Sequence, residues 1–525
     1  MTNVWAGMMG DDPVSRELFL EADIRQIAQE GLTPEQVLTQ IDFFKKGSLP
    51  VTLIRPATVG DGIITLSEGE REGLAATYDR WVQKGAVSKF VPASGAASRM
   101  FADWQGRIEH GDFDSKERGA RFAADLGKMP FLRDLREVLA GHGEYLDVLL
   151  EKRQFAEILA YILTPKGLNY ANLPKALIKF HAYPGGSRTA LEEHLVEAVL
   201  YGRDGHNVCR VHFTVSPNHE KRIRDFVSRV KRVYEKNHRV TLDVRFSTQQ
   251  GSTNTIAVDR SNRPVRDREG ALIFRPGGHG ALLANLNDSD GDIIFVKNID
   301  NVVPDRLKPL TVLYKKALAG YLLVLQEEVF RNLSLLDGGA PVSEHALAEM
   351  TAFCEEKLNV AFPQGFKSYA PADKRTVLFD RLNRPLRVCG MVKNEGEPGG
   401  APFWVDRDDV RSIQIIEAFQ VDGDSEPQKN LWSSSTHFNP VDLVCAIRDY
   451  RDRTFDLGRF ADREAASISL KNERGREVKA LELPGLWNGS MAFWNSVFVE
   501  VPLETFNPVK TIDDLLRPQH LPAGE

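Results

Sequence analysis

Two segments of the sequence carry residue types that bind phosphate groups. The loop Ala93–Met100 has mostly small side chains and follows a predicted strand. Its backbone N–H groups could therefore approach an anion where the next helix begins, and Arg99 adds a cation. Lys175 precedes a short apolar segment and could place its ammonium on a phosphate. The alternatives are an ordinary strand-to-helix turn and a solvated surface lysine. No G-x-x-x-x-G-K-[ST] motif is present, so a P-loop nucleoside triphosphatase is not expected.

A glycine-rich loop surrounds His279. The run Pro276–Gly280 places three glycines around this histidine, and glycines let a loop wrap closely around a ligand. The imidazole could donate to phosphate or sugar oxygens. The alternative is a structural histidine.

A polar cluster follows an apolar strand predicted over Asp292–Val296. The next residues are Lys297, Asn298, Ile299, Asp300 and Asn301, and we expect Lys297 to contribute a cation to phosphate. In open α/β sheets, ligands bind at the carboxyl ends of strands. Asp300 is therefore placed to hold a hard cation such as Mg²⁺, which takes one or two carboxylates together with substrate phosphate oxygens. A plain Asn/Asp-rich turn is the alternative.

The C-terminal part contains further candidates. Thr511 is a plausible helix N-cap with two aspartates in the following turn, and Lys510 precedes it. Between residues 386 and 500, Trp and Asn residues beside glycines suit a pocket for a sugar or a base, although a well-packed region of strands and turns is an equal alternative. The residues we predict to bind the second substrate here are Lys393, Glu395, His437, Asn439, Glu482 and Asn488.

Helices and strands alternate in the middle of the chain. Helical patterns such as Thr189–Tyr201 and Glu220–Lys236 separate the apolar segments. This alternation predicts an α/β domain with a mainly parallel sheet. We expect strands at Ser88–Pro92, Leu177–Phe180, Val208–Val215, Val240–Ser247 and Asp292–Val296.

Three regions are predicted along the chain. Residues 1–85 are expected to be a helical N-terminal region with capping boxes at Thr33 and Ser67, interrupted by an irregular segment over 49–64. Residues 86–385 are expected to form the central α/β domain, with helical insertions at about 101–170 and 305–380. Residues 386–525 are expected to be rich in strands and turns, to end in a helix near Thr511–Leu516 and to complete the substrate site.

The composition excludes several classes of protein. The 525 residues include 67 Lys and Arg against 73 Asp and Glu, a net charge of −6, which disfavours sequence-independent binding to nucleic acid. The four cysteines are widely spaced and are expected to be reduced and mostly buried. Met1–Arg16 does not resemble a signal peptide, and Ala317–Leu325 is too short to span a bilayer. We expect a soluble cytoplasmic enzyme with no nucleic-acid or membrane partner. The sequence leaves the oligomeric state open.

The order of these motifs resembles that of the nucleotidyltransferases that make nucleotide sugars. The most similar are UDP-sugar pyrophosphorylases, which include UTP:glucose-1-phosphate and N-acetylhexosamine uridylyltransferases. The resemblance covers roughly residues 88–300 and the C-terminal segment, and the whole chain also resembles an uncharacterised bacterial family. The segments that carry it are the small-residue loop, Pro174–Ile178, Ser216–His219, Pro276–Gly280, Asn298–Asn301 and Pro508–Thr511.

The resemblance implies a GT-A-like, Rossmann-like fold and a Mg²⁺-dependent reaction between a nucleoside triphosphate, with UTP favoured, and a sugar 1-phosphate. Arg99, Lys175 and Lys510 would act on the phosphates, and Asp300 would bind the metal. Asn298 would contact the second substrate beside the metal. Gln250, near the end of the Val240–Ser247 strand, would read the base. The residues that would bind the nucleotide are Ser94, Gly95, Ala96, Gln250, Gly278, His279 and Gly280.

Two other functions are compatible with the sequence. The first loop keeps only Gly95 where this family has several glycines, which is compatible with a protein that binds nucleotide sugars without turnover. A glycosyltransferase of related fold would need a D-x-D motif. Asp288–Asp290 has that form, but it precedes the Asp292–Val296 strand instead of following it.

Overall fold

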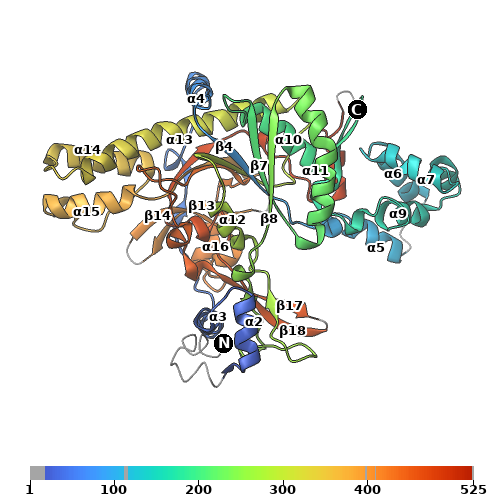
Figure 1. The fold of residues 1–525 in the computed structure, drawn as a ribbon, viewed down its shortest axis with the longest axis horizontal. Helices are drawn as coiled ribbons and strands as arrows, with labels where there is room; N and C mark the ends of the chain where they lie inside the picture. Colours follow the sequence, from blue (N-terminus) through green and yellow to red (C-terminus); the bar gives the residue numbers. More distant parts are fainter. Residues whose placement is uncertain (1–17, 111–115, 397–398, 408–409, 474, 523–525) are drawn as a thin grey trace, which may run out of the picture.

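A ten-stranded mixed sheet forms the centre of the molecule (Figure 1). The computed structural model describes residues 18–110, 116–396, 399–407, 410–473 and 475–522. Met1–Arg16, where no signal peptide was expected, lies outside them. The strand order is β2-β3-β19-β12-β16-β11-β4-β7-β8, and β15 pairs with β12. The predicted α/β class is therefore confirmed. The strands are β2 (Thr58–Val59), β3 (Gly62–Ile64), β4 (Val87–Pro92), β7 (Val208–Val215), β8 (Thr241–Thr248), β11 (Ile293–Lys297), β12 (Leu386–Lys393), β15 (His437–Phe438), β16 (Asp442–Ala446) and β19 (Asn495–Glu500).

The strand directions bring several strand ends to one edge. Strands β11, β4, β7 and β8 are parallel neighbours. Strand β16 is antiparallel to both β11 and β12, and β19 is parallel to β12, so β12 and β19 run in the same direction as β11. We call the edge where these strands end the carboxyl edge. From β4 the chain proceeds to β7 and β8 on one side and later to β11 on the other, which makes the gap between β4 and β11 a topological switch point.

Helices cover one face of the sheet, and a mixed layer covers the other. On the first face, which we call the α13 face, Phe295 packs against the long helix α13, while α10 and α11 pack near β7. On the second, the α12 face, Val296 packs with α12 and with strand β14. The covering helices are α4 (Glu68–Trp81), α10 (Ala190–Tyr201), α11 (Pro217–His238), α12 (Leu282–Asn287), α13 (Lys308–Asp337), α14 (Glu344–Leu358) and α15 (Pro371–Leu382).

A group of helices stands apart at one end of the molecule, to the right in Figure 1. It follows the small-residue loop and fills the predicted insertion between residues 101 and 170. Phe122 and Phe155 form an edge-to-face pair within it. Its helices are α5 (Ala102–His110), α6 (Lys116–Gly127), α7 (Leu132–Gly141), α8 (Leu146–Glu151) and α9 (Phe155–Leu163).

The N-terminal helices and four small sheets complete the fold. Capping boxes begin α3 at Thr33 and α4 at Ser67, as predicted. Helices α2 and α3 pack on β9, β10 and β18 instead of on the main sheet. The remaining elements are α2 (Glu21–Gln29), α3 (Pro34–Lys46), α16 (Glu426–Ser433), β1 (Thr52–Pro56), β5 (Lys179–Tyr183), β6 (Gly186–Thr189), β9 (Thr255–Ile256), β10 (Phe274–Arg275), β13 (Ala401–Arg407), β14 (Val410–Ile416), β17 (Ser467–Glu473) and β18 (Arg476–Glu482).

Two local predictions were wrong. The segment 177–180 is not a strand of the main sheet: β5 forms a separate hairpin with β6, and Ile178 and Phe180 are buried in the core that the helical insertion shares with α10, α11 and β7. The segment 49–64 is not irregular, since β1 pairs with β13 and β3 pairs with β19. The predicted C-terminal helix is present as a short 3₁₀ helix over Ile512–Leu516, with Thr511 as its N-cap.

The main sheet crosses the predicted boundary at residue 386, because β12, β16 and β19 are its strands. The division into three regions stays a prediction. All four cysteines are buried and unbonded, as expected. Among the described residues, no helix is long and apolar enough to cross a membrane.

Candidate functional site

Lys175 and Asp300 meet at the carboxyl edge. The Lys175 ammonium donates to Asp300 Oδ2 at 2.9 Å and to the carbonyl oxygen of Val509 at 2.9 Å. Both side chains are partly exposed, at 13% and 21%. Because Asp300 follows β11, this contact lies beside the switch point between β4 and β11.

Backbone hydrogen bonds join the loops that carry these residues. The Lys175 N–H donates to the carbonyl of Gly95 at 3.0 Å, which attaches the P-K segment to the small-residue loop. The Val509 N–H donates to the carbonyl of Asp300 at 3.0 Å, and the Ile512 N–H donates to that of Met100 at 3.0 Å. Four motifs that are far apart in the sequence are therefore adjacent in space.

The predicted phosphate ligands of these loops are at the surface. Ser94, Gly95, Ala96, Arg99 and Lys510 are all exposed. After β4, the loop forms a 3₁₀ turn over Ala97–Arg99 before α5 begins. The loop therefore exposes its backbone and the guanidinium of Arg99 to solvent, where an anion could reach them.

Asp514 fixes the segment that carries Lys510. Its Oδ2 accepts hydrogen bonds from the N–H groups of Lys510 at 2.8 Å and Thr511 at 2.7 Å, and from the Thr511 hydroxyl at 3.1 Å. Sequence reasoning placed Asp514 only in the first turn. The spacing Thr511-x-x-Asp514 is a capping box and was the available signal.

Lys297 is not available to a phosphate, contrary to the expectation from its place beside the Asn298–Asn301 cluster. Its side chain points to the α13 face, is 1% exposed and pairs with Glu197 Oε1 at 2.8 Å. Lys89 of β4 pairs with the other oxygen of Glu197 at 2.7 Å. The alternation of side chains along β11 explains this: residue 297 lies on the same face as Phe295, which packs against α13.

The buried cluster has strongly shifted pKa values. Burial lowers the pKa of Lys89 to about 7, although Glu197 opposes the shift. Burial acts to raise the pKa of Glu197, but the ammonium groups of Lys297 and Lys89 hold this pKa well below its usual value. Nearby, a fully buried Lys315 pairs with Asp442 at the start of β16. This network joins β4, β11, β16, α10 and α13 directly beneath the carboxyl edge.

The glycine loop around His279 packs against two other loops. A Cβ at Gly277 would lie 2.5 Å from the carbonyl oxygen of Thr253, and one at Gly280 would lie 2.0 Å from that of Pro484. Gly278 adopts φ +75°, a left-handed conformation that favours glycine. The loop therefore needs its glycines for close approach, and it meets the segment that follows β8.

His279 is held as a neutral acceptor. Its Nδ1 accepts a hydrogen bond from the Leu486 N–H at 3.1 Å, and its ring stacks on Trp487 with centroids 4.5 Å apart. Burial lowers the pKa of His279, so the imidazole is neutral near pH 7. Since Nδ1 accepts, the ring proton is on Nε2, which can donate to a ligand.

Gln250 and Glu482 lie next to this loop. The Gln250 amide donates to Asp288 Oδ2 at 2.9 Å, and Glu482 Oε2 lies 3.5 Å from the position of a Cβ on Gly278. Glu482 pairs with Lys471 at 3.0 Å. The structure thus brings Gln250, the glycine loop and Glu482 together.

A third group follows β12 and β19 at the same edge. Lys393 is opposite His437 in the β12–β15 pair, and both approach Glu500 Oε1, at 4.0 Å and 3.3 Å. Lys393 is 74% exposed, and Glu395 is also exposed. Sequence reasoning missed Glu500. The apolar run Val497–Val499 directly before Glu500, which is typical of a strand, was the available signal.

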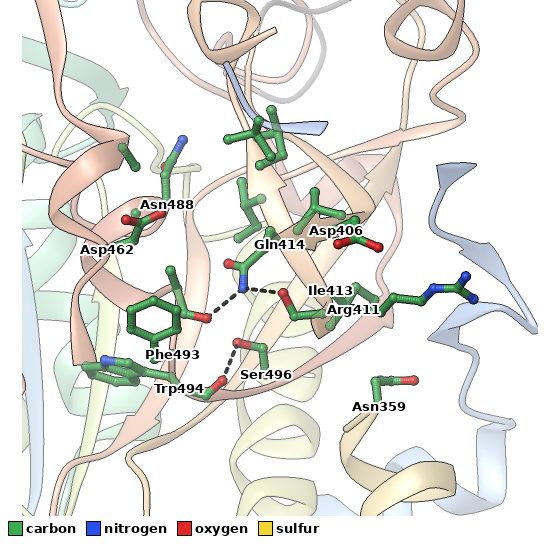
Figure 2. Close-up of a pocket in the computed structure, with 18 of the residues that line it drawn as sticks. Asn359, Asp406, Arg411, Ile413, Gln414, Asp462, Asn488, Phe493, Trp494 and Ser496 are labelled. Atoms are coloured by element: carbon green, nitrogen blue, oxygen red, sulfur yellow. Dashed lines mark hydrogen bonds between the residues drawn. The ribbon is translucent and has the colours of Figure 1, made fainter. Parts of the chain in front are cut away.

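Asn298, Asn439 and Asn488 differ in their surroundings. Asn298 is half-buried next to Lys297. The Asn439 Oδ1 accepts from the Val441 N–H at 3.0 Å, so half of its amide stabilises a turn. Asn488 is 2% exposed, lines a cavity beneath β14 (Figure 2) and lies near His279, since a Cβ on Gly485 would be 3.4 Å from Asn488 Cγ and 3.2 Å from His279 Nε2.

Three solved structures are similar in fold to this chain. The UDP-N-acetylglucosamine pyrophosphorylase of Trypanosoma brucei, solved with an inhibitor, is 13% identical, with 96% of this chain and 80% of that one covered at a TM-score of 0.48. A mutant of UDP-glucose pyrophosphorylase from Leishmania major is 14% identical, with coverage of 96% and 78% at a TM-score of 0.44. A putative UDP-N-acetylglucosamine pyrophosphorylase from Entamoeba histolytica is 9% identical, with coverage of 87% and 83% at a TM-score of 0.41.

No curated protein matches the sequence. A family described as "Domain of unknown function (DUF4301)" matches residues 20–521, and the chain belongs to this family.

Proposed function

We propose that this member of the DUF4301 family is a Mg²⁺-dependent nucleotidyltransferase that joins a nucleoside triphosphate, UTP, to a sugar 1-phosphate and releases pyrophosphate. The observation that carries the proposal is the contact between Lys175 and Asp300 at the switch point of the sheet. A reaction between two anionic substrates needs positive charge and a metal ligand at one fixed place, and ligands of open α/β sheets bind at this position.

The proposed roles follow the three groups of loops. Ser94, Gly95 and Ala96 hold the triphosphate through backbone N–H groups, while Arg99, Lys175 and Lys510 neutralise its charge. The base binds near Gln250 and Gly278–Gly280, where His279 Nε2–H is available as a donor. The residues proposed for the sugar phosphate are Asn298, Lys393, Glu395, His437, Asn439 and Glu482.

The residues present fit a magnesium ion. Within the described ranges, no group of three or more His, Cys, Asp or Glu side chains is placed to hold a metal. Mg²⁺ does not need such a group, because it binds through one or two carboxylates and completes its shell with water and phosphate oxygens. Asp300 would hold it. When bound, Mg²⁺ would neutralise the charge that develops on the triphosphate oxygens.

The chemical step requires orientation more than covalent help. A phosphate oxygen of the sugar 1-phosphate attacks the α-phosphorus and forms a new O–P bond, while the bond from the α-phosphorus to the bridging oxygen breaks and pyrophosphate leaves. Lys175 can stabilise the negative charge of the reacting phosphates only after its ammonium has exchanged Asp300 for a phosphate oxygen. Its second partner, the Val509 carbonyl, keeps the ammonium in place during the exchange.

The D-x-D alternative has little support. Asp288 accepts from Gln250, and Asp290 pairs with Arg245, so both carboxylates are engaged next to β8. Both also precede β11, whereas Lys175 and Asp300 meet beyond its end.

Pyrophosphate release tests the proposal. The purified chain is incubated with Mg²⁺, each of the four common nucleoside triphosphates and a panel of sugar 1-phosphates. We expect release with UTP that requires both substrates and stops on chelation of the metal. Binding of UTP by calorimetry without any release would instead support the non-catalytic alternative.

Variants connect the reaction to the site. Lys175→Ala and Asp300→Ala should each abolish most of the release. The matched control is Lys221→Ala, since Lys221 is 90% exposed on α11 and pairs only with Asp225. Equal activity in all three variants would exclude the proposed site.

A further inference from the structure

A second cavity lies beneath the small sheet β1–β13–β14, on the α12 face. Its volume is about 670 Å³, within the range of small-molecule sites. In Figure 2 its wall runs from Asp462 and Asn488 on one side, past Gln414, to Asp406 and Arg411 on the other.

Three buried polar atoms along this wall have no hydrogen-bond partner among the described residues. They are both amide atoms of Asn488, which is 2% exposed, and the indole Nε1 of Trp494, which is 5% exposed. An unsatisfied buried donor or acceptor is unfavourable, and proteins keep few of them. Asn488 and Trp494 together offer two donor nitrogens and one acceptor oxygen, which suits the hydroxyl groups of a ligand.

Three arginines lie at or behind the wall of the cavity, and Arg387 donates through Nη1 to the carbonyl oxygen of Trp487, the neighbour of Asn488, at 2.6 Å. Arg381 and Arg384 line it, and Arg387 donates to the hydroxyl of Ser496, which also lines it, at 2.7 Å. Among the described residues, none of the three has a carboxylate oxygen within 4.0 Å. Arg387 is fully buried, and its Nη2 has no partner at all.

The charges of Arg381 and Arg384 are therefore only partly offset, by Asp380, which forms no ion pair with either. Burial lowers the pKa of Arg384 to about 10 and also lowers the pKa values of Arg381 and Arg387. A guanidinium binds a phosphate group through two parallel hydrogen bonds. A bound phosphate would therefore offset the free-energy cost of burying these charged groups.

We propose that this cavity binds a phosphorylated sugar or polyol, with the phosphate at the arginines and the hydroxyl groups at Asn488 and Asp462. The unpartnered amide of Asn488 and the unpaired arginines line one cavity of suitable size, and their chemistries match the two ends of such a ligand.

The arginines of this site lie far from Lys175, whereas Asn488 lies near His279: a Cβ on Gly485 would be 3.4 Å from Asn488 Cγ and 3.2 Å from His279 Nε2. Arg384 precedes β12, and Ser496 lies at the start of β19, so the arginine end of the cavity is at the amino edge of the sheet. Lys175 and Asp300 are at the carboxyl edge. A strand as long as β19 separates the two edges by about 20 Å. The proposal does not depend on the proposed transferase activity.

Calorimetry without metal or nucleotide tests it. The probes are glucose 6-phosphate, fructose 6-phosphate, glycerol 3-phosphate, inorganic phosphate and glucose. We expect at least one organic phosphate to bind more tightly than phosphate or glucose alone, because only the ester reaches both ends. The Lys175→Ala/Asp300→Ala double variant should retain this binding.

Two variants should remove it. Arg381→Gln deletes one charge, and Asn488→Ala deletes an amide that has no partner, so neither leaves a protein group newly unsatisfied. Each should weaken binding by about tenfold or more. Arg331→Gln, on the exposed side of α13, is the matched control. The proposal fails if no organic phosphate binds, if Lys175→Ala/Asp300→Ala abolishes binding, or if both cavity variants bind like the parent while their unfolding midpoints are unchanged.

Discussion

The ammonium of Lys175 lies 2.9 Å from Asp300 Oδ2, although 125 residues separate the two in sequence. The contact joins the segment before β5 to the end of β11. The Lys175 ammonium also donates to the Val509 carbonyl, so a third segment of the chain takes part. In the proposed reaction, this cation and carboxylate would exchange each other for a phosphate and a metal. This is the feature on which the proposed function depends most.

Removal of either charge should lower turnover much more than stability. We expect Lys175→Ala and Asp300→Asn to reduce pyrophosphate release by about 10²–10³, since each removes a preorganised charge from the reacting phosphates. Asp300→Asn should in addition raise the Mg²⁺ concentration needed for half-maximal rate, which Lys175→Ala should not do. Rates measured across a magnesium titration check both expectations. An unchanged magnesium dependence in Asp300→Asn would remove Asp300 from the metal site.

The carboxylate of Glu197 should be critical for stability. Glu197→Gln leaves the ammonium groups of Lys89 and Lys297 buried without a counter-charge, and breaking a buried pair in this way costs about 3–5 kcal/mol. Urea unfolding measures the loss. The matched control is Glu220→Gln, because the exposed pair of Glu220 with Arg224 on α11 is worth less than about 1 kcal/mol. Equal effects of the two substitutions would contradict the assignment.

The same network predicts how stability depends on pH. The pKa of Lys89 is about 7 in the folded chain and near its ordinary value of 10.5 in the unfolded chain. Between these pKa values the unfolded state binds more protons than the folded state, so the free energy of unfolding rises with pH from about 7 to about 10. Below pH 7 Lys89 is protonated in both states and contributes no pH dependence. The slope from one such group is at most about 1.4 kcal/mol per pH unit. Lys89→Met should reduce the slope of the free energy of unfolding against pH in this range. An unaltered slope would contradict the lowered pKa of Lys89 in the folded chain.

Local patterns in the sequence predicted much of the fold. Val208–Val215 was predicted at the bounds of β7, and the capping boxes at Thr33 and Ser67 begin helices as expected. These features depend on hydrophobic periodicity and on side chains three residues apart, which are visible in a single sequence. The motifs around Gly95, Lys175, Asp300 and Lys510 were also placed on strand ends and loops, where the structure has them.

Other features depend on contacts between distant segments. No local pattern distinguishes β5, which forms a hairpin with β6, from a strand of the main sheet, because the difference lies in the strand with which it pairs. Lys297 was expected to contribute a cation to phosphate, but its ammonium is buried against Glu197 of α10, a contact that no local pattern reveals. The unpartnered amide of Asn488 likewise becomes visible only when its neighbours are known.

The glycines of the His279 loop should be necessary for its packing. A Cβ at Gly280 would lie 2.0 Å from the Pro484 carbonyl oxygen, so Gly280→Ala must push two backbone segments apart at a cost of about 1–3 kcal/mol. The control Gly127→Ala adds a Cβ that meets nothing within 4 Å and should leave stability unchanged or slightly higher. Thermal unfolding compares the two. Gly280→Ala should also raise KM for the nucleotide, because the displaced loop carries His279.

Asp514 should act through Lys510 as a positioning residue. Its Oδ2 accepts from the N–H groups of Lys510 and Thr511, and an amide nitrogen in its place could not accept these bonds. Asp514→Asn should therefore raise KM for the triphosphate severalfold while kcat for bound substrate falls less. Asp513→Asn is the matched control, since Asp513 is exposed in the same turn and, in the described part of the chain, no backbone N–H donates to its carboxylate. A fall in kcat with KM unchanged would mean that Asp514 supports folding of the segment without orienting Lys510. Rescue by Asp514→Glu, which keeps the acceptor oxygens, would support the positioning role.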